Sequence, residues 1–288
     1  MSEGVVFDLG YRPHEGERMG RGGAIRALYR DGIRRVFGIR RRARRKIFPA
    51  LLIGFAILPA LFFTAFGVIA GEFGADAFFD HPDYFNWTGN ITLVFCALAA
   101  SELVVPDRIH GTMAVYASRP LRAVDYLAAR AASMAAVVFG FVWLPHLLLL
   151  IGRAWTSNDG FGDYLIGHLD VLWETALATV VYLLAYGALA FLVAVFSSRT
   201  TLAVVIYLIV LAAWRATIEA LVDAGYEIAA LGAVPDHPGY VKDWIMSADS
   251  ENWLPERAGF DPVVSLGIIV AIGVATGFVA LRRYRSEL

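Results

Sequence analysis

The residues of this sequence that could do chemistry are ionisable side chains in long apolar stretches. Glu102 lies near the end of one stretch, and Arg108 follows six positions later. A carboxylate at membrane depth relays protons or forms an ion pair, because an isolated charge there is costly. About 14 residues of helix place Glu102 ~21 Å into the stretch, near its inner boundary. We predict a structural ion pair, with Arg108 or with segment 24–47, in preference to a proton site.

Three further polar groups lie in later apolar stretches. Arg215 and Glu219 are four residues apart, so they share one face of a helix and are predicted to pair with each other. The alternative is that they line an exit path or anchor the segment that follows. His146 comes after Pro145, which could kink a helix. We predict a packing or hydrogen-bonding role for His146 in preference to contact with a ligand.

The sequence lacks the motifs that would make it an enzyme by itself. Its two lysines, Lys46 and Lys242, both lie outside any phosphate-binding G-x-x-x-x-G-K-[ST] pattern. The single cysteine, Cys96, lies in an apolar run and is predicted to be a small buried residue. No His, Cys, Asp or Glu cluster has metal-ligand spacing. We predict no catalytic residue, metal or cofactor in this chain, so ATP and Mg would act in a partner.

Apolar stretches are the elements that must position these side chains. The 288 residues are 58% hydrophobic with a mean hydropathy of +0.59, whereas soluble domains contain about 45–50% apolar residues. The excess is concentrated in runs long enough to span a bilayer. We therefore predict an all-α membrane protein with six transmembrane helices, at about 48–70, 88–105, 131–151, 172–196, 201–222 and 262–281. These six helices would form one transmembrane domain, 48–288.

Two segments before the first span differ in character. Residues 1–23 are polar and glycine-rich, and we interpret them as a flexible tail. Residues 24–47 combine apolar residues at helical spacing with many arginines, which predicts a basic amphipathic elbow helix in the membrane interface. A soluble helix packed on a partner is the alternative. Nucleic-acid binding is disfavoured because the basic block abuts a lipid-facing span.

The placement of basic residues predicts the orientation. All but four of the 25 lysines and arginines fall in segments that share one side when the N-terminus is cytoplasmic; the exceptions are Arg153, Arg215, Lys242 and Arg257. Cytoplasmic loops carry the excess of positive charge in membrane proteins. Both termini and the loop 106–130 are therefore predicted to be cytoplasmic, and the polar, tryptophan-containing segment 223–261 is predicted to form short helices at the outer surface.

The loop 106–130 is predicted to hold a short helix, at about 109–119. Gly111 lies at its start, and Arg119 and Pro120 stop it, because proline cannot continue the hydrogen-bond ladder. A second helix starts at Leu121 and runs into the third span. A small helix braced between two spans is suited to passing force to a soluble partner.

The sequence around this loop resembles the permeases of type-2 ABC exporters, in the actinobacterial drug- and antibiotic-export branch. The resemblance covers nearly the whole chain after about Ala24. Its most specific part is an acidic residue late in the second span, then a basic residue, G-T, a short helix and a P-L-x-R-x-x-Y pattern. The corresponding residues are Glu102, Arg108, Gly111, Thr112, Arg119, Pro120, Leu121, Arg122, Tyr126 and Arg130, with Arg122 one position before the arginine of the pattern, where this sequence has Ala123. Arg130 replaces the usual lysine and keeps its charge.

The resemblance implies a permease subunit in the bacterial inner (plasma) membrane. The short helix would be a coupling helix that seats in a groove of the ATPase. Two cytoplasmic ATPase subunits and a second permease copy, identical or paired, would complete a transporter for a hydrophobic or amphipathic solute. The expected coupling residues are Arg108, His110, Gly111, Thr112, Arg119, Pro120, Leu121 and Arg122.

Two other functions fit a six-span protein. A membrane-embedded enzyme would need clustered polar catalytic residues, whereas the polar residues of these spans are scattered. A scaffold would recruit a cytoplasmic partner without moving a solute. Copurification of an ATPase, followed by solute-stimulated ATP hydrolysis, distinguishes these classes.

Overall fold

The computed structural model describes residues 20–39, 44–72, 80–118, 120–158, 160–249 and 251–285. Within these ranges the chain forms helices and connecting turns and contains no strand. Six helical elements are long and apolar enough to cross a membrane. They are α2 (Arg44–Glu72), α3 (His81–Ile109), α5 (Ala123–Thr156), the continuous α7 (Asp170–Tyr182), η1 (Leu183–Gly187) and α8 (Ala188–Phe196), α9 (Thr200–Asp223) and α12 (Pro262–Tyr284). This is the architecture of a multi-pass membrane protein.

The helices extend beyond the apolar stretches that predicted them. α3 begins at His81 instead of residue 88, because the side chain of Asp80 accepts a hydrogen bond from the backbone N–H of His81 and Pro82 occupies the first turn. α5 begins at Ala123, two residues after the helix start predicted at Leu121 and before the apolar run at 131, because Asp125 accepts from the backbone N–H of Arg122. A capped end remains helical after its sequence has become polar.

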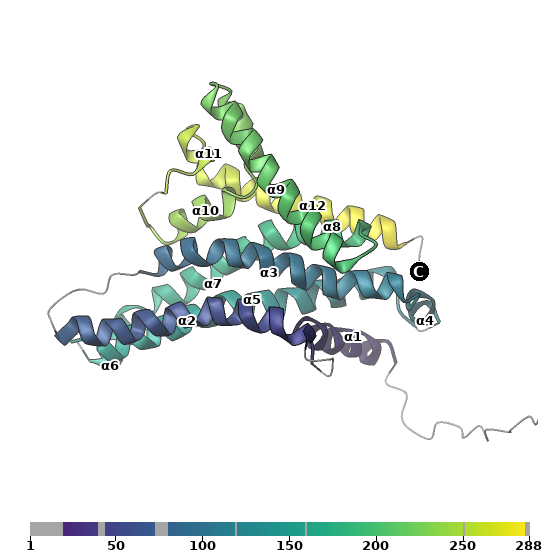
Figure 1. Cartoon of the computed structure of the whole chain (residues 1–288), viewed down its shortest axis with the longest axis horizontal. Helices are drawn as coiled ribbons and strands as arrows, with labels where there is room; N and C mark the ends of the chain where they lie inside the picture. The colour runs from purple at the N-terminus through teal and green to yellow at the C-terminus, as the bar shows by residue number, and fades with distance from the viewer. Residues whose placement is uncertain are drawn as a thin grey trace, which may run out of the picture.

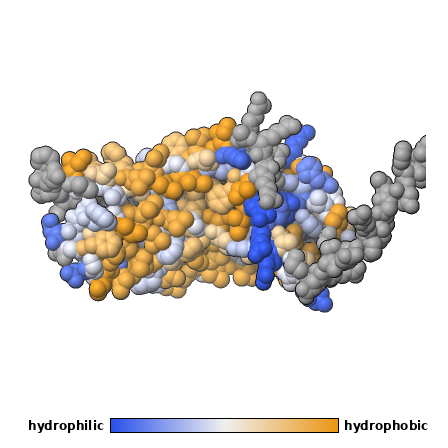
Figure 2. Space-filling model, turned by 90° about the horizontal axis from the view of Figure 1, so that it is seen from below, coloured by the Kyte–Doolittle hydropathy of each residue, from blue (hydrophilic) through white to orange (hydrophobic). Residues whose placement is uncertain are grey.

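α3 is the central helix of the bundle (Figure 1). It packs against α2, α5, α8 and α9, and 61% of its most apolar window is buried. The corresponding windows of α2, α9 and α12 are only 17%, 22% and 22% buried. Their apolar side chains therefore face outward, and Figure 2 shows hydrophobic residues covering the middle of the face that it presents, with hydrophilic residues gathered toward the ends.

A helix precedes the first span, and it packs closely on the bundle. α1 (Gly20–Val36) begins four residues before the predicted elbow helix and contacts α5 and α3. Gly32 allows this approach, since a Cβ atom there would lie 2.3 Å from the hydroxyl of Ser133. Residues 1–19 of the predicted tail and 40–43 of the basic block lie outside the described residues.

The segment 223–261 forms three short helices, as predicted. They are η2 (Glu227–Gly232), α10 (His237–Ile245) and α11 (Leu254–Arg257). α10 packs against α12, α7 and α3, and it buries His237, Val241 and Lys242. The segment therefore enters the bundle and is part of its core. Figure 1 places it at the end opposite α1, the short α4 (Met113–Ala117) and the C-terminus.

The fourth span contains a local irregularity. Its central residues, Leu183–Gly187, form a π-helix, and such turns leave part of the backbone ladder unpaired. The hydroxyl of Tyr207 donates to the carbonyl of Tyr186 at 3.0 Å, and the hydroxyl of Tyr186 donates to the carbonyl of Pro235 at 3.0 Å. The π-helix thus connects α9 to the 223–261 segment.

Candidate functional site

The short helix in the loop between α3 and α5 is shorter than predicted. α3 continues through Pro106 to Ile109, and Gly111 then turns the chain with a φ of +63°, which glycine adopts readily. α4 covers only Met113–Ala117, not 109–119, because Ile109 is the last residue of α3 and His110, Gly111 and Thr112 form a turn. Arg119 lies outside the described residues. Pro120 is exposed and Leu121 is buried.

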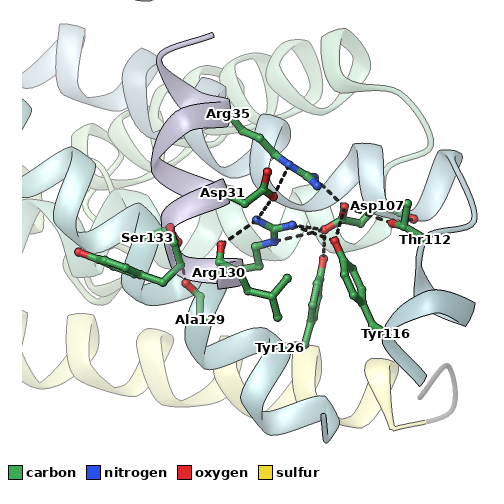
Figure 3. Close-up of polar contacts among 11 residues, drawn as sticks. Asp31, Arg35, Asp107, Thr112, Tyr116, Tyr126, Ala129, Arg130 and Ser133 are labelled. Atoms are coloured by element: carbon green, nitrogen blue, oxygen red, sulfur yellow. Dashed lines mark hydrogen bonds and ion pairs between the residues drawn. The ribbon is translucent and has the colours of Figure 1, made fainter. Parts of the chain in front are cut away.

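A buried carboxylate lies directly beneath α4 (Figure 3). Asp107 is 1% exposed, and its Oδ2 accepts from Nη2 of Arg130 at 2.6 Å and from Nε at 3.2 Å. Arg130 itself is fully buried. Arg35 of α1 donates to the other oxygen of Asp107 at 2.6 Å. Two guanidinium groups from different helices therefore converge on one carboxylate, in the strongest class of hydrogen bond.

Hydroxyl groups connect α4 to the same carboxylate. Tyr126 donates to Asp107 at 2.9 Å, Tyr116 donates at 3.3 Å and Thr112 donates at 3.2 Å. The Thr112 hydroxyl is also 2.9 Å from the backbone carbonyl of Asp107. Tyr116 belongs to α4 and Thr112 directly precedes it, so these bonds attach the short helix to the ends of α3 and α5.

A second carboxylate completes the cluster, which we call the charge junction and define as Asp31, Arg35, Asp107 and Arg130. Asp31 lies 2.7 Å from Arg35 and 3.1 Å from Arg130. The junction thus contains two acids and two arginines, which balance in charge. It joins α1, α3 and α5, with α4 resting on it. An ion cluster satisfied from all sides can tolerate burial that an isolated charge cannot.

A further ion pair holds α1 to the start of α5. Arg21 donates two hydrogen bonds to Asp125, at 2.9 and 2.7 Å. Asp125 is also the residue that caps α5 through the N–H of Arg122. The first turn of α5 is therefore stabilised by its own cap and by α1 together.

The other predicted coupling residues lie around the junction without being part of it. Arg108 donates to the carbonyls of Val195 and Ser197, at the end of α8. Glu102 and His110 line a cavity of about 660 Å³ with Arg34, Arg35 and other residues of α1 and α3. Glu102 thus lines the same cavity as residues of α1, and the ion pair predicted for it stays a prediction.

His146 has the structural role predicted for it. Its ring stacks on Phe85 at 3.9 Å between centroids, and its Nδ1 lies 3.3 Å from Nδ1 of His81. Both histidines are at least 97% buried, at 1% and 3% exposure. Their Nε2 atoms have no hydrogen-bond partner among the described residues.

Arg215 and Glu219 form the predicted pair, at 3.1 Å. Arg215 also donates to Asp236 at 2.7 and 3.4 Å, and Asp236 is nearly fully buried. Asp236 belongs to the 223–261 segment, so the alternative prediction of an anchor is confirmed as well. The sequence could not choose between the two functions, and the structure contains both.

Lys242 is a buried cation that the sequence did not single out. Its Nζ donates to the side chain of Asn86 at 2.7 Å and to the carbonyl of Pro82 at 3.2 Å, and it lies 2.5 Å from Asp243. Burial lowers the pKa of Lys242 and raises the pKa of Asp243, because both charged forms lose hydration. The pair connects the 223–261 segment to the start of α3.

Sequence analysis also missed Asp107, Asp31 and Tyr116. The available signal was weak: Asp107 is a carboxylate one residue after a proline, at the end of an apolar helix. Nothing in local spacing indicates that it meets Arg130, which is 23 positions away.

The chemistry of this site is electrostatic and mechanical. Within the described residues, no group of three or more His, Cys, Asp or Glu side chains could hold a metal ion. The junction instead fixes a small exposed helix to three longer helices. No protein-family model matches the chain, and no curated protein matches it significantly.

Proposed function

We propose that the chain is the permease subunit of an ATP-binding cassette exporter and that α4 is its coupling helix. The observation that supports this most is the contrast within α4. Val115 on its surface is 53% exposed, whereas Met113 is buried in the hydrophobic core. A push on the exposed face would pass through Tyr116 to Asp107 and from there to α1, α3 and α5.

Two further features support a transporter assembly. The chain has no phosphate-binding loop, so the motor would be a separate ATPase that binds on the α4 side. α2 and α9 bury little of their apolar surface, which leaves area for lipid and for a second permease copy. The cargo would be a hydrophobic or amphipathic solute, since the spans contain few charges. The two permeases would rock against each other when the ATPases close.

This proposal places α1 in the cytoplasmic interface and both termini in the cytoplasm. Cysteine accessibility tests the orientation. Cys96 is buried, so a Cys96→Ser background allows single reporters. His110→Cys should react only with a reagent applied to the cytoplasmic side, and Ile228→Cys only from the outside. Labelling of His110→Cys from the outside would end the coupling proposal.

Copurification tests the partner. Tagged protein from its own host should bring down a P-loop ATPase in equal amounts, and candidate solutes should stimulate ATP hydrolysis by that complex. Absence of an ATPase would overturn the proposal. If an ATPase copurifies but neither its rate of ATP hydrolysis nor the movement of solute depends on this chain, the chain is a scaffold.

The exposed face of α4 gives a sharper test. Val115→Asp adds a charge to that face without touching the charge junction, so it should leave folding intact and reduce ATPase capture and transport. Ile166→Asp is the matched control, since Ile166 is 71% exposed on α6 (Phe161–Gly167) at the other end of the molecule. Equal effects of the two substitutions would contradict a specific docking role for α4.

A further inference from the structure

An apolar groove lies on the side of the bundle, away from the charge junction and the 223–261 segment. It has a volume of about 410 Å³ and lies between α5, the π-helix η1, α8 and α12. Small-molecule pockets in proteins have volumes of about 300–1,000 Å³, so the groove is large enough for a ligand. Of the described residues that line it, Thr276 alone has a polar side chain.

The groove opens toward lipid. Val274 and Phe278 lie on α12 beside the groove residues Gly273 and Gly277, and they are 68% and 65% exposed. Large apolar side chains with this exposure on a membrane-spanning helix face hydrocarbon. An occupant of the groove therefore enters from the bilayer.

Three arginines lie next to the residues at one end of the groove. Leu281 and Val124 are its last residues on α12 and α5, and Arg282, Arg285 and Arg122 follow or precede them by one to four positions. The rings of Tyr126 and Tyr284 lie 5.2 Å apart, which brings these two helix ends together. All three arginines are exposed. Asp125, the acid nearest to them on α5, is bound by Arg21.

We propose that this groove binds one anionic phospholipid from the leaflet on the arginine-rich side, with an acyl chain between α5 and α12 and the phosphate at Arg122, Arg282 and Arg285. The apolar lining suits the chain, and the positive rim suits the headgroup. A zwitterionic lipid offers the same chain but no net negative charge. The lipid site does not rest on the transport function, because its groove and arginines would bind a lipid even if no ATPase partner existed.

Small residues line the groove, and replacing one of them with a larger residue tests whether the groove binds a lipid. A Cβ atom added at Gly277 would meet nothing within 4 Å. A larger side chain at this position would therefore fill the groove without displacing its walls. Gly267, on the same helix, also has open space around it and does not line the groove. It is the matched control for any effect of replacing glycine in α12.

Native mass spectrometry of the full chain, stripped of lipid and supplied with dioleoyl phosphatidylglycerol or dioleoyl phosphatidylcholine, measures binding. The wild-type protein should bind one phosphatidylglycerol with affinity about tenfold or more above phosphatidylcholine. Gly277→Phe should weaken that binding by about tenfold or more, whereas Gly267→Phe should bind as the wild type does. Ala131→Leu, on the facing helix α5, should act as Gly277→Phe does and serves if that variant fails to fold.

The headgroup part of the proposal has its own variant. Arg122→Gln, Arg282→Gln and Arg285→Gln together should lower phosphatidylglycerol affinity to that of phosphatidylcholine and leave phosphatidylcholine binding unchanged. Equal affinities for the two lipids in the wild-type protein would overturn the proposal. Unchanged phosphatidylglycerol binding in both groove variants would also overturn the proposal. If those variants instead lose a dimer peak and keep lipid binding, the occupant of the groove is a second copy of the chain.

Discussion

Both ends of the molecule bury charged groups, but they satisfy them in different ways. At the α1 end, Asp107 has two arginines and three hydroxyl groups around it, from α1, α4, α5 and the turn before α4. At the opposite end, Lys242 pairs with its sequence neighbour Asp243 and with Asn86. A buried ion cluster with many partners is rigid, because the movement of one side chain cannot release the others.

This difference in the number of partners indicates which end of the molecule opens more readily. The two buried histidines near Lys242 leave their Nε2 atoms without a hydrogen-bond partner among the described residues. The ion pairs that join the 223–261 segment to α9 are separate from one another, such as Arg215 with Asp236 and Arg257 with Asp223. We expect the α1 end to act as a stiff unit and the 223–261 segment to open first.

The largest effect should come from the charge junction itself. Asp107→Asn leaves the fully buried Arg130 with the half-exposed Asp31 as its remaining counter-charge, and loss of one partner of a buried ion pair costs about 3–5 kcal/mol. Unfolding in mixed micelles with increasing SDS measures the change. Asp31→Asn is the control, since the Asp31 side chain is 45% exposed and should lose less than about 1 kcal/mol. Equal losses would mean that the junction is not a single buried unit.

A smaller effect is expected from the pair at the opposite end. Lys242→Met leaves Asp243 buried without its cation and should cost about 1–3 kcal/mol in the same assay. Adding Asp243→Asn should recover most of that loss, because it removes the second charge. The corresponding double change, Asp107→Asn with Arg130→Met, should recover little, because Arg35 and three hydroxyl groups also bind the Asp107 carboxylate. If the two double variants recover similar fractions of the lost stability, the two ends do not differ in how they hold their buried charges.

Acid should loosen the 223–261 segment before it affects the charge junction. Burial lowers the pKa of His237, whose ring contacts Ser265 at 2.9 Å and the carbonyl of Leu231 at 3.0 Å. A folded-state pKa below the unfolded value of about 6.5 means that protonation favours the open form. Stability is therefore full above pH ~6.5 and is lost as the pH falls through the folded pKa.

Hydrogen exchange of segment 223–261, measured between pH 7 and pH 5 and corrected for intrinsic rates, tests this expectation. Exchange should accelerate at the lower pH in the wild-type protein, and His237→Gln should remove most of the pH dependence. Acceleration of α1 and α4 to the same degree would show that the acid effect is global.

The smallest effect should come from the exposed partner of Arg215. Glu219→Gln should change stability by no more than about 0.5 kcal/mol, because the Glu219 side chain is 40% exposed and such helix pairs are weak. Asp236→Asn should cost more, since Asp236 is 2% exposed and anchors the segment. Thermal unfolding of the two variants compares them, and a larger loss for Glu219→Gln would reverse the assignment.

The six spans could be predicted because each depends on its own residues. In lipid, every backbone group must be satisfied within the segment, so a long apolar run is enough to indicate a helix. The ends were less predictable: α3 begins at His81, well before its apolar run, because Asp80 caps it, whereas α5 begins at Ala123, close to the helix start predicted at Leu121. The pair Arg215 and Glu219 was predictable for a similar reason, because four residues of helix bring them together.

The candidate site was predicted only in outline. The loop and its short helix were found, but the residue at the centre of the site, Asp107, was not. Its partners lie 23 positions away in Arg130 and 72 positions away in Arg35. Lys242 and Asn86 are 156 positions apart. No local pattern encodes such pairs.

The sequence by itself determined how many helices are long and apolar enough to cross a membrane, which segments are basic and which loop holds a short helix. Hydropathy, charge and proline act within a few turns of chain, and those properties follow from them. The tertiary structure decided which charges share a site, that segment 223–261 is buried in the bundle, and where small residues leave a groove between α5 and α12. These features depend on the rotation and depth of each helix against its neighbours, which only the packing of the whole bundle defines.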